Sequence, residues 1–497
     1  MMYDQKKSDL SVLAGKSANK DGQLLAESME RREGTEGNAV GNRTCRTPSR
    51  ESVFQGIDRV RQAAKERKKE KFTALLHHAN VELLTTAFYW LKRDAAPGVD
   101  GVTWEEYEQN LEANIIDLHA RVHRGAYRAL PSRGTYIPKP DGRQRPLGVA
   151  ALEDKIVQRA VVEVLNAIYE TDFLGFSYGF RPGRSQHDAL DALAFAIKRT
   201  KVNWIWDADV SNFFGSVSHE WLERFVEHRI GDTRIIRLMR KWLKAGVMED
   251  GEIDVPETGT PQGSVASPLL GNIYLHYVFD LWADRWRRHH AQGNVIIVRY
   301  ADDIVAGFEY EADARRFHAD VQQRMEQFAL SLHPDKTRLI EFGRHAAENR
   351  AKRGLGKPES FNFLGFTHIC GRSKQGGFQL QRKTRRDRMR ARLQKIKDEL
   401  RRRWHWPIPE QGKWLRQVVI GYLAYHAVPT NSRRINAFRY YVVNLWRMAL
   451  RRRSQKDRTT WERISRIASD WLPNPRILHP WPETRFTVNH PRWEPGA

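Results

Sequence analysis

Residues 294–308 read NVIIVRYADDIVAGF and decide the fold that the rest of the chain must fit. Two apolar, β-branched arms flank Ala301-Asp302-Asp303, a pattern typical of a β-hairpin with acids at its tip. Two adjacent carboxylates repel one another, and a bound divalent cation removes that repulsion. Mg²⁺ in particular takes few carboxylates together with substrate phosphates. The stretch therefore predicts an antiparallel sheet that carries a metal site at one hairpin tip.

A second acidic strand end lies at residues 202–210, VNWIWDADV, where an apolar run closes on Asp207 and Asp209. An acid there, together with the pair at 302 and 303, would complete a site for two metal ions about 3.5–4 Å apart. Such a pair of ions binds the attacking and leaving oxygens of a phosphoryl displacement. Asp209 is the candidate because it lies at the strand end. Asp207 lies on the same face of the strand, so spacing alone leaves the two in competition.

The order of the remaining elements predicts an α+β fold on an antiparallel sheet. Helical spacing covers 54–129 and 152–170, and residues 131–150 have the Pro and Gly punctuation of a hairpin. After about residue 380 the chain is expected to be all-helical. Residues 1–50 are expected to form a disordered leader, and the Pro-rich last thirty residues an irregular tail.

Positive charge is concentrated in one part of the chain. The formal net charge is +23, and residues 372–466 alone hold 27 Lys and Arg against 6 Asp and Glu, with eleven aromatic residues among them. Cations release counterions from phosphates and aromatic rings stack on unpaired bases, so this window predicts a nucleic-acid partner. A solvated basic face or a patch for anionic lipid are the alternatives.

Other compositional features exclude whole classes of protein. No run of about 18 apolar residues predicts a membrane span, and the N-terminus has no apolar segment typical of a secretory signal. The two cysteines, Cys45 and Cys370, cannot form a disulfide framework or a Cys-rich zinc site. We therefore expect a cytosolic protein without a membrane partner.

Nine blocks in order resemble the group II intron-encoded reverse transcriptase/maturase family. The Tyr300-Ala301-Asp302-Asp303 box looks like that of reverse transcriptases, and the wider resemblance runs from about 54 to about 480. The blocks are GAYRALPSRGTYIPKPDGRQRPLGV (125–149), SYGFRPGRSQHDAL (177–190), DADVSNFFGSV (207–217), GTPQGSVASPLLGNIYL (259–275), RYADDIV (299–305), LHPDKTRLI (332–340), FNFLGF (361–366), VIGYLAYHAVPT (419–430) and VNLWRMALRRRSQKDRTTWERI (443–464).

The resemblance implies a right-hand polymerase followed by a helical maturase domain X. Its expected parts are a leader (1–50), an N-terminal extension with fingers (51–200), a palm with an antiparallel sheet (201–370), the start of a helical thumb (371–410), thumb and domain X (411–480) and a C-terminal tail (481–497). It also implies an RNA-directed DNA polymerase that uses two Mg²⁺ ions and dNTPs, copies an RNA template from a DNA primer, binds its group II intron RNA, and assists splicing and insertion into target DNA. Because the chain stops soon after the expected domain X, we expect no endonuclease of its own.

The resemblance also assigns residues. In the family an acid lies five residues before an aromatic that screens the sugar 2′ position, which selects Asp209 and Phe214 over Asp207. The implied metal ligands and catalytic acids are Asp209, Asp302 and Asp303, with the Val210 carbonyl as an extra ligand. The family usually has Asp where this chain has Gly215.

The remaining assignments are to nucleotide and RNA binding. Lys139 and Arg145 are expected to clamp the triphosphate, Gln262 to position the template–nucleotide pair, and Lys336 to lie near the acids or phosphates. Arg181 and Arg184 are expected to contact the template backbone. Two basic runs are expected to bind RNA: Arg401, Arg402, Arg403, Arg451, Arg452 and Arg453.

Two other functions fit parts of the pattern. Gly215 favours a splicing cofactor whose polymerase has decayed, although the acids and Phe214 argue against that. A domesticated or defence-associated reverse transcriptase is the other alternative, and the apparent domain X argues against it.

Overall fold

The computed structural model describes residues 49–138, 144–249, 251–255, 257–261, 263–453 and 459–489. Its centre is a four-stranded antiparallel sheet in the order β6-β7-β3-β8. The strands are β3 (Trp204–Asp209), β6 (Val295–Tyr300), β7 (Asp303–Phe308) and β8 (Arg338–Glu341). The expected strand at 202–210 and the expected hairpin at 294–308 are confirmed. The structure is therefore α+β, as predicted.

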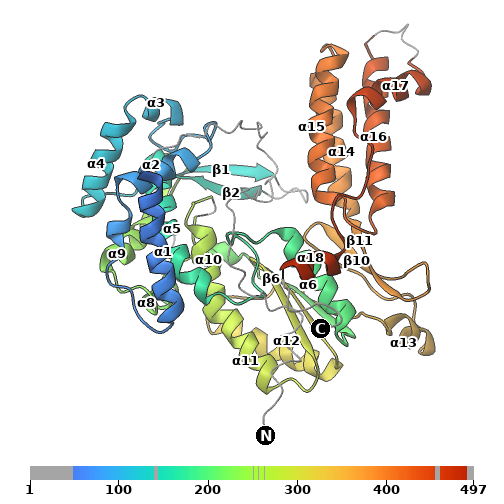
Figure 1. Cartoon of the computed structure of the whole chain (residues 1–497), viewed down its shortest axis with the longest axis horizontal. Coiled ribbons are helices and arrows are strands. Elements are labelled where there is room, and N and C mark those ends of the chain that lie inside the picture. Colours follow the sequence, from blue (N-terminus) through green and yellow to red (C-terminus); the bar gives the residue numbers. More distant parts are fainter. Residues whose placement is uncertain are drawn as a thin grey trace.

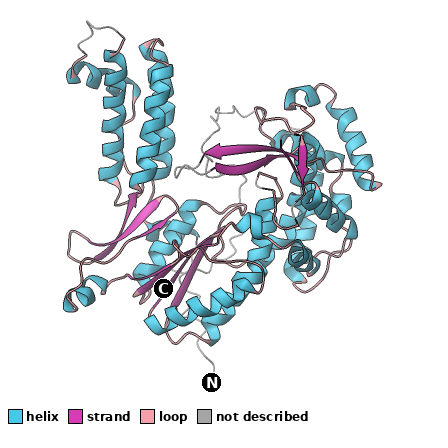
Figure 2. Cartoon of the chain, turned by 180° about the vertical axis from the view of Figure 1, so that it is seen from behind, coloured by secondary structure: helices cyan, strands magenta, loops and turns pink. Residues whose placement is uncertain are grey.

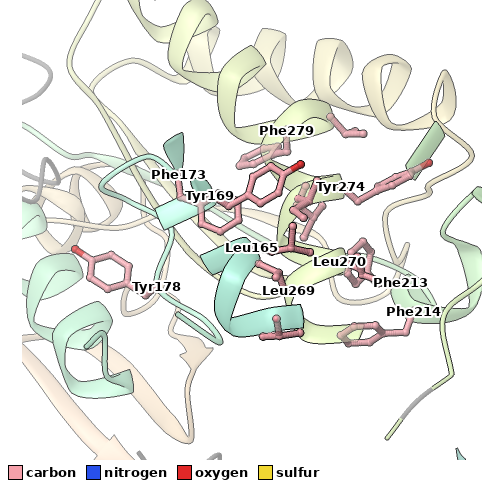
Figure 3. Close-up of a cluster of buried hydrophobic side chains, with 14 of the residues drawn as sticks. Leu165, Tyr169, Phe173, Tyr178, Phe213, Phe214, Leu269, Leu270, Tyr274 and Phe279 are labelled. Carbon is pink, nitrogen blue, oxygen red and sulfur yellow. The ribbon is translucent and has the colours of Figure 1, made fainter. Parts of the chain in front are cut away.

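Helices from distant parts of the sequence pack against this sheet and form one large apolar core (Figures 1 and 3). Trp206 of β3 is fully buried and meets Phe317 of α12 edge to face, with ring centroids 5.3 Å apart. A single π-helical turn, η2 (His276–Asp280), interrupts the run between two α-helices. The surrounding helices are α5 (Leu152–Asp172), α6 (Gln186–Arg199), α7 (Phe213–Ser216), α8 (His219–Glu227), α9 (Thr233–Lys244), α10 (Ser267–Leu275), α11 (Leu281–His289) and α12 (Glu311–Glu326).

The N-terminal helices and a second sheet lie on one side of the molecule (Figure 1). The predicted hairpin is confirmed as β1 (Ser132–Pro138) paired with β2 (Gln144–Val149), in a sheet ordered β2-β1-β4-β5. The short strands β4 (Val247–Glu249) and β5 (Glu252–Asp254) complete this sheet. The helices here are α1 (Ser49–Glu66), η1 (Leu76–His78), α2 (Val81–Trp90), α3 (Trp104–Glu108) and α4 (Leu111–His123).

A helical bundle with its own core stands on a third sheet (Figure 2). The sheet is β9 (Phe361–Phe363), β10 (Phe366–Arg372) and β11 (Phe378–Thr384), and α13 (Ala346–Lys352) precedes it. The bundle is α14 (Arg386–Arg402), α15 (Ile408–His426), α16 (Ser432–Arg451) and α17 (Trp461–Trp471). The expected all-helical region thus begins at α14.

Two expected domain boundaries differ from the structure. The boundary at 370 falls inside β10, and the boundary at 410 falls inside the bundle, where α14 and α15–α17 share one apolar core. Pro407 serves as the N-cap of α15 and so separates two helices of one bundle. The physical unit is therefore the four-helix bundle from 386 to 471.

The C-terminal segment is also more ordered than expected. Its Pro-rich sequence predicts an irregular tail, whereas α18 (Pro482–Asn489) returns to the main core and packs on α6 (Figure 1). Phe486 stacks on Phe195 with ring centroids 4.2 Å apart, and Arg485 pairs with Asp191 at 3.2 Å. This segment joins the bundle to the central domain. None of the helices in the described ranges is long and apolar enough to cross a membrane.

Candidate active site at the hairpin tip

The register of the central sheet brings the predicted acids together. β3 and β7 are antiparallel, and Asp209 is the direct partner of Asp303. Directly opposed residues point to the same face with Cβ atoms about 4.5–5.5 Å apart. Asp207 is instead opposite Val305, one pleat further from the tip. The register therefore favours Asp209 over Asp207, which sequence spacing alone left open.

Asp302 lies in the tight turn that joins β6 to β7. Tyr300 pairs with Asp303, so only Ala301 and Asp302 connect the strands. Ala301 has φ +54°, in the left-handed region that is uncommon for a residue with a Cβ. Asp303 is exposed and Asp302 is half-buried. The strained turn thus presents two consecutive carboxylates at the end of an otherwise buried hairpin.

The loop before α6 packs directly behind this turn. A Cβ built on Gly179 would lie 2.3 Å from the Ala301 nitrogen, so only glycine permits this approach. The Tyr178 amide donates to the Arg299 carbonyl and the Arg299 amide donates to the Phe176 carbonyl, both at 2.8 Å. The segment 176–178 therefore extends the sheet beside β6 and supports the turn.

A fully buried guanidinium ties the turn to three other elements. Arg299 donates to both carboxylate oxygens of Asp280, at 2.7 and 2.6 Å, and to the Ser177 hydroxyl at 2.7 Å. It also donates to the Asn272 amide oxygen and to the Ala301 carbonyl, both at 3.0 Å. Asp280 ends the π-helical turn, and such turns recur near functional sites. Arg299 therefore fixes the turn that carries Asp302.

Basic side chains face both acids of β3. The Lys336 ammonium contacts the Asp209 carboxylate, and Arg338 lies 3.5 Å from Asp207. Asp209 is held from the backbone as well, because the His333 amide donates to its carbonyl at 2.8 Å. Burial raises the pKa of Asp207 to about 6, and Arg338 opposes that shift. The structure thus places Lys336 beside one expected metal ligand.

The three acids suit a metal that arrives with its substrate. Within the described parts of the chain, no three His, Cys, Asp or Glu side chains form a ready metal-binding group. Mg²⁺ does not need one, since it binds through one or two carboxylates and completes its shell with water and substrate phosphates. Asp209 and Asp303 would supply hard oxygen donors, and Val210 follows Asp209 in an isolated bridge to Leu332. The donor chemistry therefore fits Mg²⁺.

Phe214 lies in the short helix α7 that follows β3, and its ring is largely buried (Figure 3). The side chain is 6% exposed, and a Cβ on Gly271 of α10 would lie 3.2 Å from the Phe214 ring. The Phe214 carbonyl accepts from the Thr260 amide at 2.7 Å. The ring therefore belongs to the apolar core, and Phe214 follows Asp209 by five residues in the sequence.

Gly215 is a site of close packing. A Cβ here would lie 2.4 Å from the Asn212 side-chain nitrogen, and the Cβ position of Gly259 is 3.0 Å from the Gly215 Cα. Asn212 has φ +42° and precedes α7. A side chain at 215 would therefore have to displace the exposed Asn212 side chain, whereas glycine, which replaces the family's usual Asp, leaves it in place.

Three expected nucleotide-binding residues fall at the edges of what the structure describes. Lys139 and Gln262 lie outside the described residues. Arg145 pairs with Ile137 in the β1–β2 register, but its side chain is not among those described. Their expected roles stay predictions.

Burial argues against the expected template contact of Arg181, whereas Arg184 is only partly buried and its expected contact stays a prediction. Arg181 is 4% exposed and donates to Glu170 and to the carbonyls of Leu174 and Ser177. Arg184 donates to the Gly175 carbonyl at 2.6 Å, and burial lowers its pKa to about 10. The Arg181 guanidinium therefore braces the 174–184 loop from inside, while Arg184 contacts the same loop from a partly exposed position.

The two arginine runs converge at one end of the bundle. Arg401 and Arg452 line the same cavity. Arg403 instead pairs with Glu399 and lies over the rings of Trp406 and Trp414, while Arg453 donates to the Trp406 carbonyl. The other two run members, Arg402 and Arg451, are exposed at this end. The structure thus divides the six arginines into cavity-lining, exposed and structural ones.

Sequence reasoning missed the buried Arg299 network. Its charged partner, Asp280, lies 19 positions away in an apolar helical stretch, where no motif marks it. One signal was present: Arg299 is a lone charge inside the run VIIVRY, and a charge in a buried strand needs a partner.

Comparison with known proteins gives the site its context. A family model described as "Reverse transcriptase (RNA-dependent DNA polymerase)" matches residues 137–368, a range that contains all three acids. Protein YkfC of Escherichia coli (strain K12) is 33% identical over 312 residues, which are 56% of this chain and 77% of YkfC.

Two further relatives carry intron names. The group II intron-encoded protein LtrA of Lactococcus lactis subsp. cremoris is 33% identical over 224 residues, 44% of this chain and 37% of LtrA. The nuclear intron maturase 2, mitochondrial, of Arabidopsis thaliana is 29% identical over 106 residues, 20% of this chain and 14% of that protein. The resemblance drawn from the motifs is confirmed: the chain belongs to the reverse transcriptases, which are RNA-directed DNA polymerases, and among them to the group II intron-encoded reverse transcriptase/maturase family.

Proposed function

We propose that the chain joins deoxynucleotides to a DNA primer on an RNA template at the β6–β7 hairpin tip. The observation that carries this proposal is the pairing of Asp209 with Asp303 beside the Ala301-Asp302 turn. Two Mg²⁺ ions held by Asp209, Asp302, Asp303 and the Val210 carbonyl would stabilise charge on the attacking and leaving oxygens. Arg299 and the 176–179 segment hold the turn, so the carboxylates are positioned before substrate binds.

The proposal extends to the arrangement of parts. We interpret the central sheet as the palm, the β1–β2 hairpin as part of the fingers, and the bundle α14–α17 as the thumb with the beginning of domain X. The order of the elements supports this interpretation, because the hairpin precedes the acidic strands and the basic bundle follows them. The expected roles of Lys139, Arg145 and Gln262 at the incoming nucleotide belong to the same proposal.

Phe214 and Lys336 are the two nucleotide-site residues that the structure describes. The Phe214 ring, packed against α10 and five residues after Asp209 in the sequence, would exclude a ribose 2′-hydroxyl by its bulk. The Lys336 ammonium, on the Asp209 carboxylate in this structure, is in reach of a phosphate that approaches the acids. We propose that it exchanges the carboxylate for the triphosphate when nucleotide binds.

The RNA partner is proposed from charge. The bundle and the strands before it carry most of the net positive charge, with exposed Trp404, Tyr440 and Trp461 among the cations. This combination suits a structured RNA with unpaired bases. We propose that the RNA is the group II intron that encodes the chain, and that the complex acts in the cytosol on splicing and on insertion into target DNA.

Sequencing the RNA that co-purifies with the chain at moderate salt tests the proposed partner. A single structured RNA that contains the gene's own flanks is the expected result, and a splicing assay with that RNA then follows. A heterogeneous population of cellular RNA would contradict the intron partner and favour a domesticated enzyme. The polymerase proposal would survive that outcome, because it depends on the hairpin tip.

A further inference from the structure

A cavity of about 340 Å³ opens between two helices at the end of the bundle where the arginine runs converge. It lies between α14 and α16, away from the hairpin tip. Its volume is at the small end of the range for ligand pockets, about 300–1,000 Å³. It can therefore hold one planar ring but has no room for a helix.

The lining comes from one face of each helix. On α14 and the residues just after it, the contributing positions are spaced by three, one and three residues, and on α16 the spacing is the same. Such positions lie on a single helical face. They are Lys397, Leu400, Arg401 and Trp404 from the first segment and Leu445, Met448, Ala449 and Arg452 from the second.

The chemistry of the lining separates a floor from a rim. Leu400 is 1% exposed at the floor, whereas Trp404 and Met448 are 39% and 42% exposed at the mouth. The charged members are Lys397, Arg401 and Arg452, and all three are cations. Arg401 has Asp398 at 3.6 Å, an exposed pairing of the kind that contributes little and dissociates readily.

We propose that this cavity binds one unpaired nucleobase of the RNA, stacked on Trp404 and seated over Leu400, while the flanking phosphates pair with Arg401, Arg452 and Lys397. The apolar lining and the exposed Trp404 indole suit the face of a base. The charged residues that line the cavity are all cations, which suits the phosphates on either side of that base. The proposal rests on the RNA binding proposed above and adds the site at which an unpaired base is held.

Photocrosslinking locates the contact directly. An RNA transcript of the gene's flanks that contains 4-thiouridine is irradiated with the full chain, and the crosslinked peptides are mapped. Adducts on residues 397–404 or 445–452 are expected. Adducts confined to other parts of the chain would overturn the proposal.

Variants separate base stacking from phosphate pairing. Trp404→Ala should weaken binding of the same transcript about 5- to 150-fold, the range equivalent to about 1–3 kcal/mol for one stacked base, with the salt dependence unchanged. Arg401→Gln and Arg452→Gln should each reduce the slope of log affinity against log salt by about 1. Ala449→Phe fills the cavity without changing any charge, so it should act like Trp404→Ala. The matched control is Trp481→Ala, because Trp481 is 50% exposed outside the cavity.

The outcomes distinguish the two proposals. If the wild-type chain binds no RNA, the proposed function itself fails. If it binds RNA and neither Trp404→Ala nor Ala449→Phe changes the affinity, RNA binding stands and the base site is wrong. Loss of a protein partner in place of RNA in these two variants would likewise overturn the base site.

Discussion

The Arg299 guanidinium and the Asp280 carboxylate form an ion pair at 2.6 Å in which both side chains are completely buried. The pair connects the strand that leads into the Tyr300-Ala301-Asp302-Asp303 turn with the π-helical turn at 276–280. The same guanidinium reaches the Ala301 carbonyl, so the position of the turn depends on a charge pair in the core.

Breaking this pair should cost both stability and activity. Arg299→Met leaves Asp280 buried without its cation, and such changes cost about 3–5 kcal/mol. Arg299→Lys keeps the charge but loses the planar guanidinium that donates to several partners at once. It should therefore recover part of the stability and a smaller part of the activity. Urea unfolding and primer extension are the measurements. Arg315→Met is the control, because the Arg315–Glu311 pair is exposed and should be worth less than about 1 kcal/mol. Equal effects of the two Met variants would contradict this account.

Lys336 should compete with Mg²⁺ for Asp209. In Lys336→Met the carboxylate loses its ammonium partner, so the ion should stabilise the folded chain at several-fold lower concentration. Extension at limiting dNTP should fall, because the same lysine is proposed to bind phosphate. Melting temperature measured over a Mg²⁺ titration checks the first effect. Lys201→Met, which removes an 80% exposed lysine, should leave the titration unchanged. If the Mg²⁺ concentration at the midpoint of the melting-temperature titration were the same in Lys336→Met as in wild type, Lys336 and Mg²⁺ would not compete for Asp209.

Gly215→Asp, which restores the acid usual in the family, should disturb the Asn212 side chain. The new Cβ would lie 2.4 Å from the Asn212 side-chain nitrogen, so that exposed side chain must move aside, and we expect primer extension to fall by about tenfold or less. Replacing Asn212 with glycine as well removes the clashing side chain and suits its φ of +42°, and should restore part of the activity. If Gly215→Asp alone raised activity, the glycine would instead mark a decayed polymerase.

Buried histidines should make the junction between bundle and central domain sensitive to acid. Burial lowers the pKa of His368 to about 3, of His426 to about 3 and of His187 to about 2. Below pH 6.5 the unfolded chain binds protons that the folded chain does not, so stability is retained above that pH and falls as the pH drops. Each group contributes up to about 1.4 kcal/mol per pH unit.

Denaturant titrations between pH 7.5 and 5 measure this loss in wild type and in His368→Phe. The His368 ring is fully buried and stacks on Phe361 at 4.7 Å, so phenylalanine should be accommodated and should reduce the pH dependence. His289→Phe, at an exposed position, should leave the pH dependence as in wild type. If the free energy of unfolding changed equally with pH in all three proteins, the buried His368 would not be a source of the acid sensitivity.

The parts of the fold that sequence could predict are those with local signals. The apolar residues on both sides of Asp302 and Asp303 predicted the β6–β7 hairpin. The acids at the end of the apolar run 202–210 predicted where β3 ends. The choice between Asp207 and Asp209 needed the pairing with β7, because register depends on residues about a hundred positions away.

Long-range packing accounts for the predictions that failed. Arg181 lies in a Gly- and Pro-rich stretch that looks like an exposed loop, yet Glu170 of α5 neutralises it inside the protein. The resemblance implied a boundary at 410, although the helices on both sides of it share one core. The tail looked irregular because the phenylalanine that anchors α18, Phe486, has its partner on α6.

The most direct test of the central claim separates chemistry from RNA binding. Asp302→Ala combined with Asp303→Ala removes two of the proposed metal ligands, one half-buried and one exposed, far along the chain from the basic bundle. Primer extension on an RNA template and binding of the gene's flanking RNA are measured on the same folded preparation. We predict loss of extension to background with RNA affinity within about twofold of wild type. Extension that survives in the double variant, or RNA binding that is lost together with extension, would contradict a catalytic site at this hairpin tip.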